Sequence, residues 1–249
     1  MPCVRILGCR VDAVGRAEAV ERIAELANAG DAQLVVTLGV EMVMAARRDA
    51  AFAAAIDDAA LVTCDTIGLL LVSRLRGGPL RQRVTGVDLV GALARRSAVE
   101  RDVRLFLLGG AGDTALRAAS VLERAYPGAQ IAGTHDGYFD EAHSRDVTAA
   151  VRASGANVLL AGLGSPKQEL WLVRHLREAG CGVGVGIGGS LDVYAGNVQR
   201  APALARRAGL EWAYRLAKEP RRWRRQLALP QFAAAALVET LVARKAGKK

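Results

Sequence analysis

The sequence has few of the residues that build disulfide frameworks and metal sites. It contains four cysteines and three histidines in 249 residues, with no C-x-x-C pair and no histidines at zinc-ligand spacing. No two aspartates lie two residues apart, so the D-x-D arrangement that can hold Mn²⁺ or Mg²⁺ is missing. We therefore expect no disulfide framework and no metal site.

Long apolar runs are also missing. No stretch reaches the ~18 apolar residues that a membrane-spanning helix needs. The N-terminus, Met1–Arg5, shows no signal-peptide pattern, so we expect a cytoplasmic protein. Hydrophobic residues make up 51% and charged residues 24%, which excludes wholesale disorder. A chain of this length can bury a large core in one to two domains.

Positive charge is concentrated at one end. Residues 200–249 hold 13 Lys and Arg and 3 Asp and Glu, a net charge of +10. Residues 1–199 hold 21 Lys and Arg and 22 Asp and Glu, a net charge of −1. Such asymmetry indicates an anionic partner. Three interpretations stay open: nucleic acid stacking on interleaved aromatic residues, an anionic bilayer, or a solvated basic helix. In the bilayer case Trp212, Trp223 and Phe232 would lie at the interface.

Apolar runs alternate with amphipathic stretches along residues 1–199. We expect strands at 34–37, 61–63, 103–108, 130–134, 158–161 and 183–187. We expect helices near 13–28, 41–56, 66–75, 86–98, 113–125, 141–153, 167–179 and 203–217. This alternation predicts a Rossmann-like α/β core with a mostly parallel sheet over 1–199. Residues 200–249 would form a basic helical appendage that includes an apolar helix at 233–242.

The turns after the strands carry the candidate chemistry, because ligands of such folds bind beyond the carboxyl ends of the strands. Gly110, Gly112 and Ala115 satisfy G-x-G-x-x-A between a strand and a helix. This turn favours a nucleotide diphosphate, with a nucleotide sugar ahead of NAD, and a plain strand–helix turn remains the alternative. Asp65 also follows a strand, where it would cap the next helix or serve as a general base.

A third strand end begins a well-signalled helix. Ser165 is expected as its N-cap and Pro166 as its first residue, which places Lys167 and Gln168 in the first turn, toward the ligand edge. A well-capped helix without a binding role is the alternative.

A set of motifs resembles one family over about residues 5–230. The motifs are Thr37-x-x-x-Glu41, Asp65-x-x-Gly68, Arg83-Val84-Thr85-Gly86-x-Asp88, Gly162-Leu163-Gly164-x-Pro166-x-Gln168-Glu169, Gly188-Gly189-x-x-Asp192-x-x-Ala195-Gly196, Arg200-Ala201-Pro202, Gly209-Leu210-Glu211-Trp212-x-Tyr214-Arg215-Leu216 and Glu219-Pro220-Arg221-Arg222. In this order they resemble the WecG/TagA/CpsF family of bacterial glycosyltransferases. The resemblance implies an inverting transfer without metal or other cofactor, from a UDP-sugar, with N-acetylmannosamine as the best-known sugar. The acceptor would be N-acetylglucosamine on a polyprenyl diphosphate, used in cell-surface polysaccharide synthesis.

The resemblance also implies roles for individual residues. Asp65 corresponds to the general base and Thr37 to a pocket threonine beside it. The nucleotide-sugar pocket would include Arg83, Gln168 and Asp192. The appendage arginines, some of which would meet the diphosphates, correspond to Arg215, Arg221, Arg222, Arg224 and Arg225. The implied location is the inner face of the cell membrane, with an anionic membrane surface as partner, no nucleic acid, and a homo-oligomer left open.

One position departs from the family pattern. Gly39 stands where the family usually has an asparagine whose amide could bind the donor sugar. Either the substitution is tolerated, with water in place of the amide, or the donor sugar differs. Two other functions remain as alternatives: a non-catalytic nucleotide-sugar-binding protein, and a nucleic-acid-binding Rossmann protein that uses the basic tail.

Overall fold

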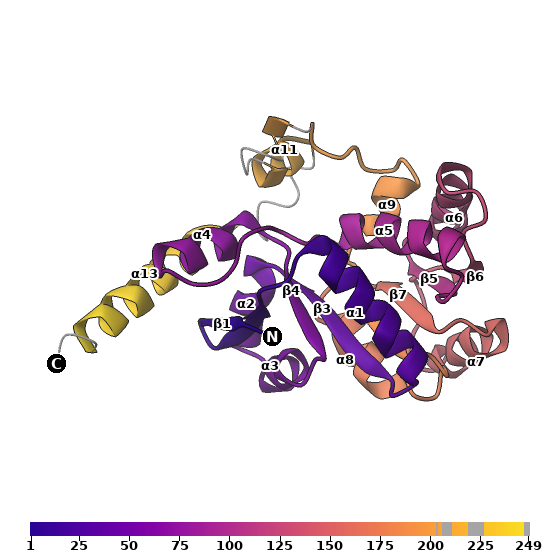
Figure 1. The fold of residues 1–249 in the computed structure, drawn as a ribbon, viewed down its shortest axis with the longest axis horizontal. Helices are drawn as coiled ribbons and strands as arrows, with labels where there is room; N and C mark the ends of the chain where they lie inside the picture. The colour runs from indigo at the N-terminus through magenta and orange to yellow at the C-terminus, as the bar shows by residue number, and fades with distance from the viewer. Residues whose placement is uncertain (203, 206–210, 219–226, 247–249) are drawn as a thin grey trace.

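A computed structural model describes residues 1–202, 204–205, 211–218 and 227–246 of the protein (Figure 1). The strands are β1 (Cys3–Ile6), β2 (Cys9–Asp12), β3 (Gln33–Leu38), β4 (Leu61–Cys64), β5 (Leu105–Gly109), β6 (Ile131–His135), β7 (Val158–Gly162) and β8 (Val183–Gly186). The helices are α1 (Arg16–Ala29), α2 (Val40–Ala46), α3 (Ala50–Asp57), α4 (Ile67–Leu75), α5 (Gly86–Val99), α6 (Thr114–Ala125), α7 (Ser144–Ser154), α8 (Lys167–His175), α9 (Ser190–Tyr194), α11 (Glu211–Lys218) and α13 (Ala228–Ala246).

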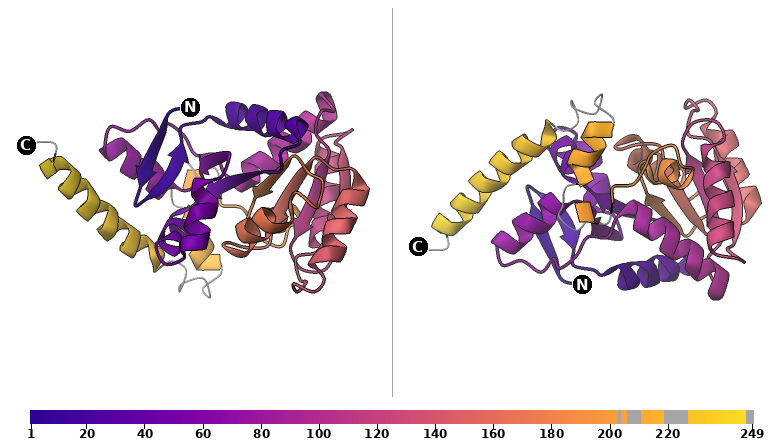
Figure 2. Two further views of the ribbon diagram at one scale, coloured as in Figure 1. Left: turned by 90° about the horizontal axis from the view of Figure 1, so that it is seen from below. Right: turned by 90° about the horizontal axis from the view of Figure 1, so that it is seen from above.

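A six-stranded sheet in the order β4-β3-β8-β7-β5-β6 forms the centre of the molecule, and every pairing in it is parallel. Successive strand residues point to opposite faces. Val36 therefore packs in one core cluster with α2, α3, α8 and α13, and Val35 in the other with α1, α5 and α6. Figure 2 shows these helices on both sides of the sheet. Both faces are covered, so the predicted Rossmann-like α/β class is confirmed.

All six predicted strands are present, but some helix predictions are wrong. The expected helix at 41–56 is two helices, because the Asp49 side chain accepts a hydrogen bond from Phe52 N (3.0 Å) and starts α3. The predicted Ser165 cap is absent, since α8 begins at Lys167 and no side chain caps its N-terminus. Of the helix expected at 203–217, the structure describes α11, which begins at Glu211.

A hairpin and a short helix escaped the sequence prediction. Strands β1 and β2 pair in antiparallel register through a two-residue turn at Leu7 and Gly8, both with positive φ. A leucine rarely takes that conformation, so the turn lacks the usual Asn-Gly signal. Helix α9 has only five residues, too few for a periodic apolar pattern to show.

Helix α13 lies along the outside of the molecule, at the end opposite α6 and α7 (Figure 1). It packs against α2 and α4. Phe232 is 3% exposed, so its predicted place at a membrane interface is wrong. Its ring fits beside Gly68, where a Cβ atom would lie 3.5 Å from Phe232 Cε1.

Polar contacts complete the docking of α13. Arg76 Nη2 forms an ion pair with Glu239 (2.7 Å), and Arg76 Nε donates to Thr240 Oγ1 (2.8 Å). No helix among the described residues is long and apolar enough to cross a membrane.

Candidate active site

The predicted site residues of the core follow different strands but share one edge of the sheet. Parallel strands end on the same side, so Thr37, Gly39, Asp65 and the Gly110 turn all lie at the carboxyl edge. Strands β4 and β5 are four spacings apart in the sheet order, roughly 19 Å at about 4.8 Å per spacing. A ligand that touches both Asp65 and the Gly110 turn must therefore extend across the edge.

Asp65 follows β4, the outermost strand on its side. Its Oδ1 accepts a hydrogen bond from the Gly86 amide (3.2 Å), the first residue of α5. The interpretation as a cap of the next helix is wrong, because α4 has Thr66 at its N-cap position without a side-chain bond. The carboxylate is half-buried and held against the N-terminus of α5, which orients it.

Arg83 brings positive charge to the same corner. Burial raises the pKa of the neighbouring Cys64 thiol to about 12; the charge of Asp65 adds to this rise and the charge of Arg83 opposes it. Arg83 also lines a groove of about 700 Å³ between α1 and α5, together with Arg16, Gln82 and Asp88. This groove is polar and partly cationic, which suits an anionic ligand.

Thr37 and Gln168 are tied to the backbone of the segment around the end of β8. Thr37 Oγ1 donates to Gly186 O (2.7 Å), and Gln168 Oε1 accepts from Gly188 N (3.1 Å). Thr37 is 7% exposed and Gln168 only 2%. In this structure the Gln168 side chain shapes the turn after β8 instead of projecting into solvent, while Lys167 is exposed and donates to Phe139 O (3.3 Å).

The Gly110 turn is a tight turn that requires glycine. Gly110 and Gly112 have φ values of +73° and +55°, and a Cβ at Gly110 would lie 2.4 Å from Thr114 Cγ2. The turn leads into the N-terminus of α6, and a helix N-terminus is a position that can bind an anion.

Asn197 connects this turn to Asp192. Its Nδ2 donates to Thr114 Oγ1 (3.0 Å) and to Asp192 Oδ1 (3.1 Å). The sequence prediction missed Asn197, because a single asparagine after a glycine carries no pattern that marks a site.

Arg200 joins the start of the C-terminal segment to the corner near Asp65. Its Nη2 lies 2.6 Å from Asp88 Oδ1, and Thr85 Oγ1 donates to Asp88 Oδ2 (2.8 Å). Burial acts to raise the pKa of Asp88, but the hydrogen bonds from Arg200 and Thr85 and the charges of Arg200 and Arg16 hold it below its usual value. The pair therefore stays ionised at neutral pH.

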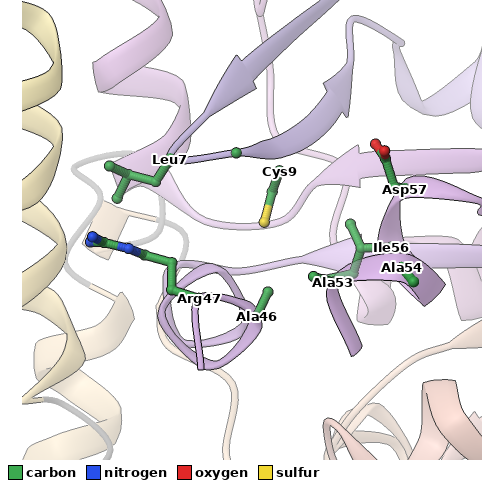
Figure 3. A pocket seen from close by; sticks show the side chains of 9 residues that line it. Leu7, Cys9, Ala46, Arg47, Ala53, Ala54, Ile56 and Asp57 are labelled. Atoms are coloured by element: carbon green, nitrogen blue, oxygen red, sulfur yellow. The ribbon is translucent and has the colours of Figure 1, made fainter. Parts of the chain in front are cut away.

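A second hollow, of about 310 Å³, lies away from this edge (Figure 3). Cys9, Ile56 and small alanines line it, with Arg47 and Asp57 at its rim. Burial and the charge of Asp57 raise the pKa of the Cys9 thiol, so the thiol is protonated at neutral pH and a poor nucleophile. None of the predicted site residues lines this hollow.

Comparison with known proteins decides the family. The profile described as the glycosyl transferase WecG/TagA/CpsF family matches residues 4–246. The chain belongs to this family. It is a glycosyltransferase, and the resemblance inferred from the strand-end motifs is confirmed.

Two relatives of this glycosyltransferase carry the same name. An N-acetylglucosaminyldiphosphoundecaprenol N-acetyl-beta-D-mannosaminyltransferase of Bacillus spizizenii (strain ATCC 23059 / NRRL B-14472 / W23) is 36% identical over 203 residues, 82% of this chain and 78% of the relative. The enzyme of that name from Bacillus subtilis (strain 168) is 32% identical over 206 residues, 83% of this chain and 79% of the relative.

The appendage arginines of the glycosyltransferase are not placed at the site. Arg215 lies in α11, but only its backbone is described, and Arg221, Arg222, Arg224 and Arg225 lie outside the described residues. Their roles remain predictions from the family resemblance. One contact that does place α11 is the hydrogen bond from Tyr214 Oη to Gln199 Oε1 (3.0 Å).

Proposed function

We propose that this glycosyltransferase moves a sugar, N-acetylmannosamine in the first instance, from a UDP-sugar to N-acetylglucosamine linked to a polyprenyl diphosphate. Both relatives are named for an N-acetylmannosaminyl transfer to such an acceptor. The observation that supports the proposal is the shared edge, which holds an oriented carboxylate after β4 and a glycine turn, leading into the α6 N-terminus, after β5.

The reaction follows from this layout as a direct displacement. Asp65 takes the proton from an acceptor hydroxyl while that oxygen forms a bond to the anomeric carbon. The bond from the anomeric carbon to the diphosphate breaks on the opposite face, so configuration inverts and UDP leaves with the electron pair. Arg83 and other cationic side chains near Asp65 offset the charge on the leaving diphosphate, whereas the Gly110 turn and the α6 N-terminus, roughly 19 Å from Asp65, can meet only the far end of the nucleotide. The proposed transfer needs no metal ion.

The acceptor side of the proposal involves the groove at Arg83. The groove is lined by Arg16 and Arg83, two cations that suit a diphosphate, and Arg83 is close enough to Cys64, the neighbour of Asp65, to act on the pKa of its thiol. The acceptor would approach from β4, at one end of the sheet, and the donor from the centre.

A lipid-linked acceptor also requires a membrane surface. Helices α4 and α13 pack together and expose large apolar side chains that the core does not use. These are Leu71, Leu75, Leu237, Val238, Leu241 and Val242, each at least 50% exposed. We propose that this surface, with the basic residues of 200–249, docks on the inner face of an anionic membrane.

The test is UDP release from a panel of UDP-sugars, with and without a synthetic N-acetylglucosamine-diphospho-lipid, in the presence of EDTA. Release that depends on the acceptor and survives EDTA supports the metal-independent transfer, and the productive donor identifies the sugar. UDP binding without release from any donor would favour a non-catalytic binding protein. Salt-sensitive binding to DNA or RNA, without UDP binding, would favour the nucleic-acid alternative.

A further inference from the structure

Glu169 is a buried acid that the proposed reaction does not use. It is 0% exposed, in the first turn of α8, and its Oε1 accepts a hydrogen bond from Gln168 Nε2 (2.6 Å). Burial raises the pKa of the Glu169 carboxyl, and hydrogen bonds from Gln168 and Ser165 only partly oppose the rise. Burying a carboxyl group destabilises the fold unless hydrogen bonds offset the loss of water, so the contacts of Glu169 are informative.

The Glu169 carboxyl determines which way the Gln168 amide faces. An amide has one accepting end and one donating end. Glu169 accepts from the donating end, which leaves the Gln168 oxygen toward Gly188 N (3.1 Å). The reverse orientation would bring the Gln168 NH₂ group against the Gly188 N–H, donor against donor. Without an acceptor at position 169, the Gln168 amide would no longer favour the orientation that points its oxygen toward Gly188 N.

The strand β8 makes room for this pair of side chains. A Cβ at Gly186 would lie 2.8 Å from both Gln168 Nε2 and Glu169 Oε1. On the β3 side, Thr37 Oγ1 donates to the Gly186 carbonyl. The end of β8 is therefore held by Thr37 on one side and by the Gln168–Glu169 pair on the other, directly before Gly188, which has a φ of +52°.

We propose that Glu169 is a positioning residue, which orients the Gln168 amide and through it holds the turn at Gly188 in the conformation that receives the nucleotide-sugar donor. The inference rests on the proposed function for its ligand, a uridine diphosphate. The turn lies at the carboxyl edge of the central strand β8, between Thr37 and the Gly110 turn. Glu169 acts through Gln168 and does not itself touch substrate.

The experiment uses the full-length chain and two readouts. Amide hydrogen exchange by NMR measures the protection of Gly188 N–H without any ligand, and calorimetry measures the Kd for UDP. The variants are Glu169→Gln, which keeps an acceptor oxygen, Glu169→Leu, which removes it, Gln168→Ala, and the double variant Gln168→Ala/Glu169→Leu. Glu178→Leu is the matched control, because Glu178 is exposed shortly after α8.

We expect Glu169→Leu and Gln168→Ala each to reduce Gly188 protection and to weaken UDP binding, both by about 10-fold, the cost of one lost buried hydrogen bond. Glu169→Gln and Glu178→Leu should stay within about 2-fold of wild type. The double variant should match Gln168→Ala alone, because the effect of Glu169 passes through Gln168.

Three outcomes would overturn the proposal: full protection of Gly188 in Glu169→Leu, additive losses in the double variant, or a Glu169→Gln variant as impaired as Gln168→Ala. If Glu169→Leu does not fold, two outcomes still overturn the proposal. One is a Glu169→Gln variant as impaired as Gln168→Ala, and the other is full protection of Gly188 in Gln168→Ala. If the wild type binds no UDP while Gly188 exchange responds as expected, the proposed donor is wrong and the positioning role of Glu169 stands.

Discussion

The carboxyl edge of the sheet and helix α13 are held by different kinds of contact. At the edge, Thr37, Asp65 and Gln168 each make a hydrogen bond to a backbone group of another element. Helix α13 instead docks through the buried ring of Phe232 and an ion pair at Arg76. The comparison teaches that the side chains of the edge are fixed by backbone groups of the core, whereas α13 is held by a few side chains that single substitutions can remove.

The largest expected effect comes from the edge. Asp65→Asn keeps an oxygen for the Gly86 amide but removes the base, so turnover should fall by about 10² to 10⁴-fold while UDP-sugar binding is retained. Single-turnover assays together with calorimetry measure the two quantities. Turnover at the wild-type level would remove Asp65 from the mechanism.

The next effect is on the docking of α13. Phe232→Ala should lose about 3 kcal/mol of packing beside Gly68, which releases the helix and lowers liposome association and turnover without unfolding the sheet. Circular dichroism and hydrogen exchange across 228–246 test this. Phe232→Leu is the conservative control, and equal damage from both variants would contradict a packing role.

The exposed apolar surface gives a smaller, separate effect. Leu237→Glu/Leu241→Glu should weaken binding to anionic liposomes by about 10 to 100-fold, since two side chains no longer enter the apolar part of the bilayer. Leu116→Glu, at an equally exposed leucine on α6, should have no effect. If all three substitutions weaken binding alike, the contact is not localised to α13.

The raised pKa of the buried Glu169 carboxyl predicts a pH dependence of stability. The pKa of Glu169 is raised in the folded state, so the wild type binds more protons folded than unfolded and loses stability as pH rises from about 4.5 through the folded pKa. Glu169→Gln removes this dependence. We expect the Tm of the wild type to fall relative to that of the variant as the pH is raised above about 5. The fall should be about 2–4 °C for each kcal/mol by which the free energy of unfolding decreases. Parallel Tm curves would show that Glu169 titrates normally.

The smallest effect concerns Gly39. It occupies the N-cap position of α2 without a side-chain bond, and a Cβ there would lie 3.2 Å from Thr66 Cγ2. Gly39→Asn should change the free energy of unfolding by less than about 0.5 kcal/mol. A changed preference among UDP-sugars in the release assay would show that this position selects the donor. An unchanged preference would show that the family's asparagine is dispensable here.

Local patterns in the sequence predicted much of the fold. Apolar runs predicted all six strands of the parallel sheet, and several of these runs are continuous because such strands are buried on both faces. The hairpin escaped, since its turn has Leu7 at a positive-φ position where such two-residue turns usually carry asparagine. Likewise, the predicted interface role of Phe232 failed because the face of a helix that is buried depends on its neighbours.

The sequence by itself determined the fold class, the family and the set of polar residues at strand ends, because apolar periodicity and motif spacing are local properties of the chain. Only the tertiary structure decided what those residues contact. It bonds Asp65 to the Gly86 amide, buries Gln168 beneath the turn at Gly188 and links Asp192 to Thr114 through Asn197. The contacts of Asp65, Gln168 and Thr114 join segments that are 20 or more residues apart in the chain, and the strand order that brings them together is not encoded in any one segment.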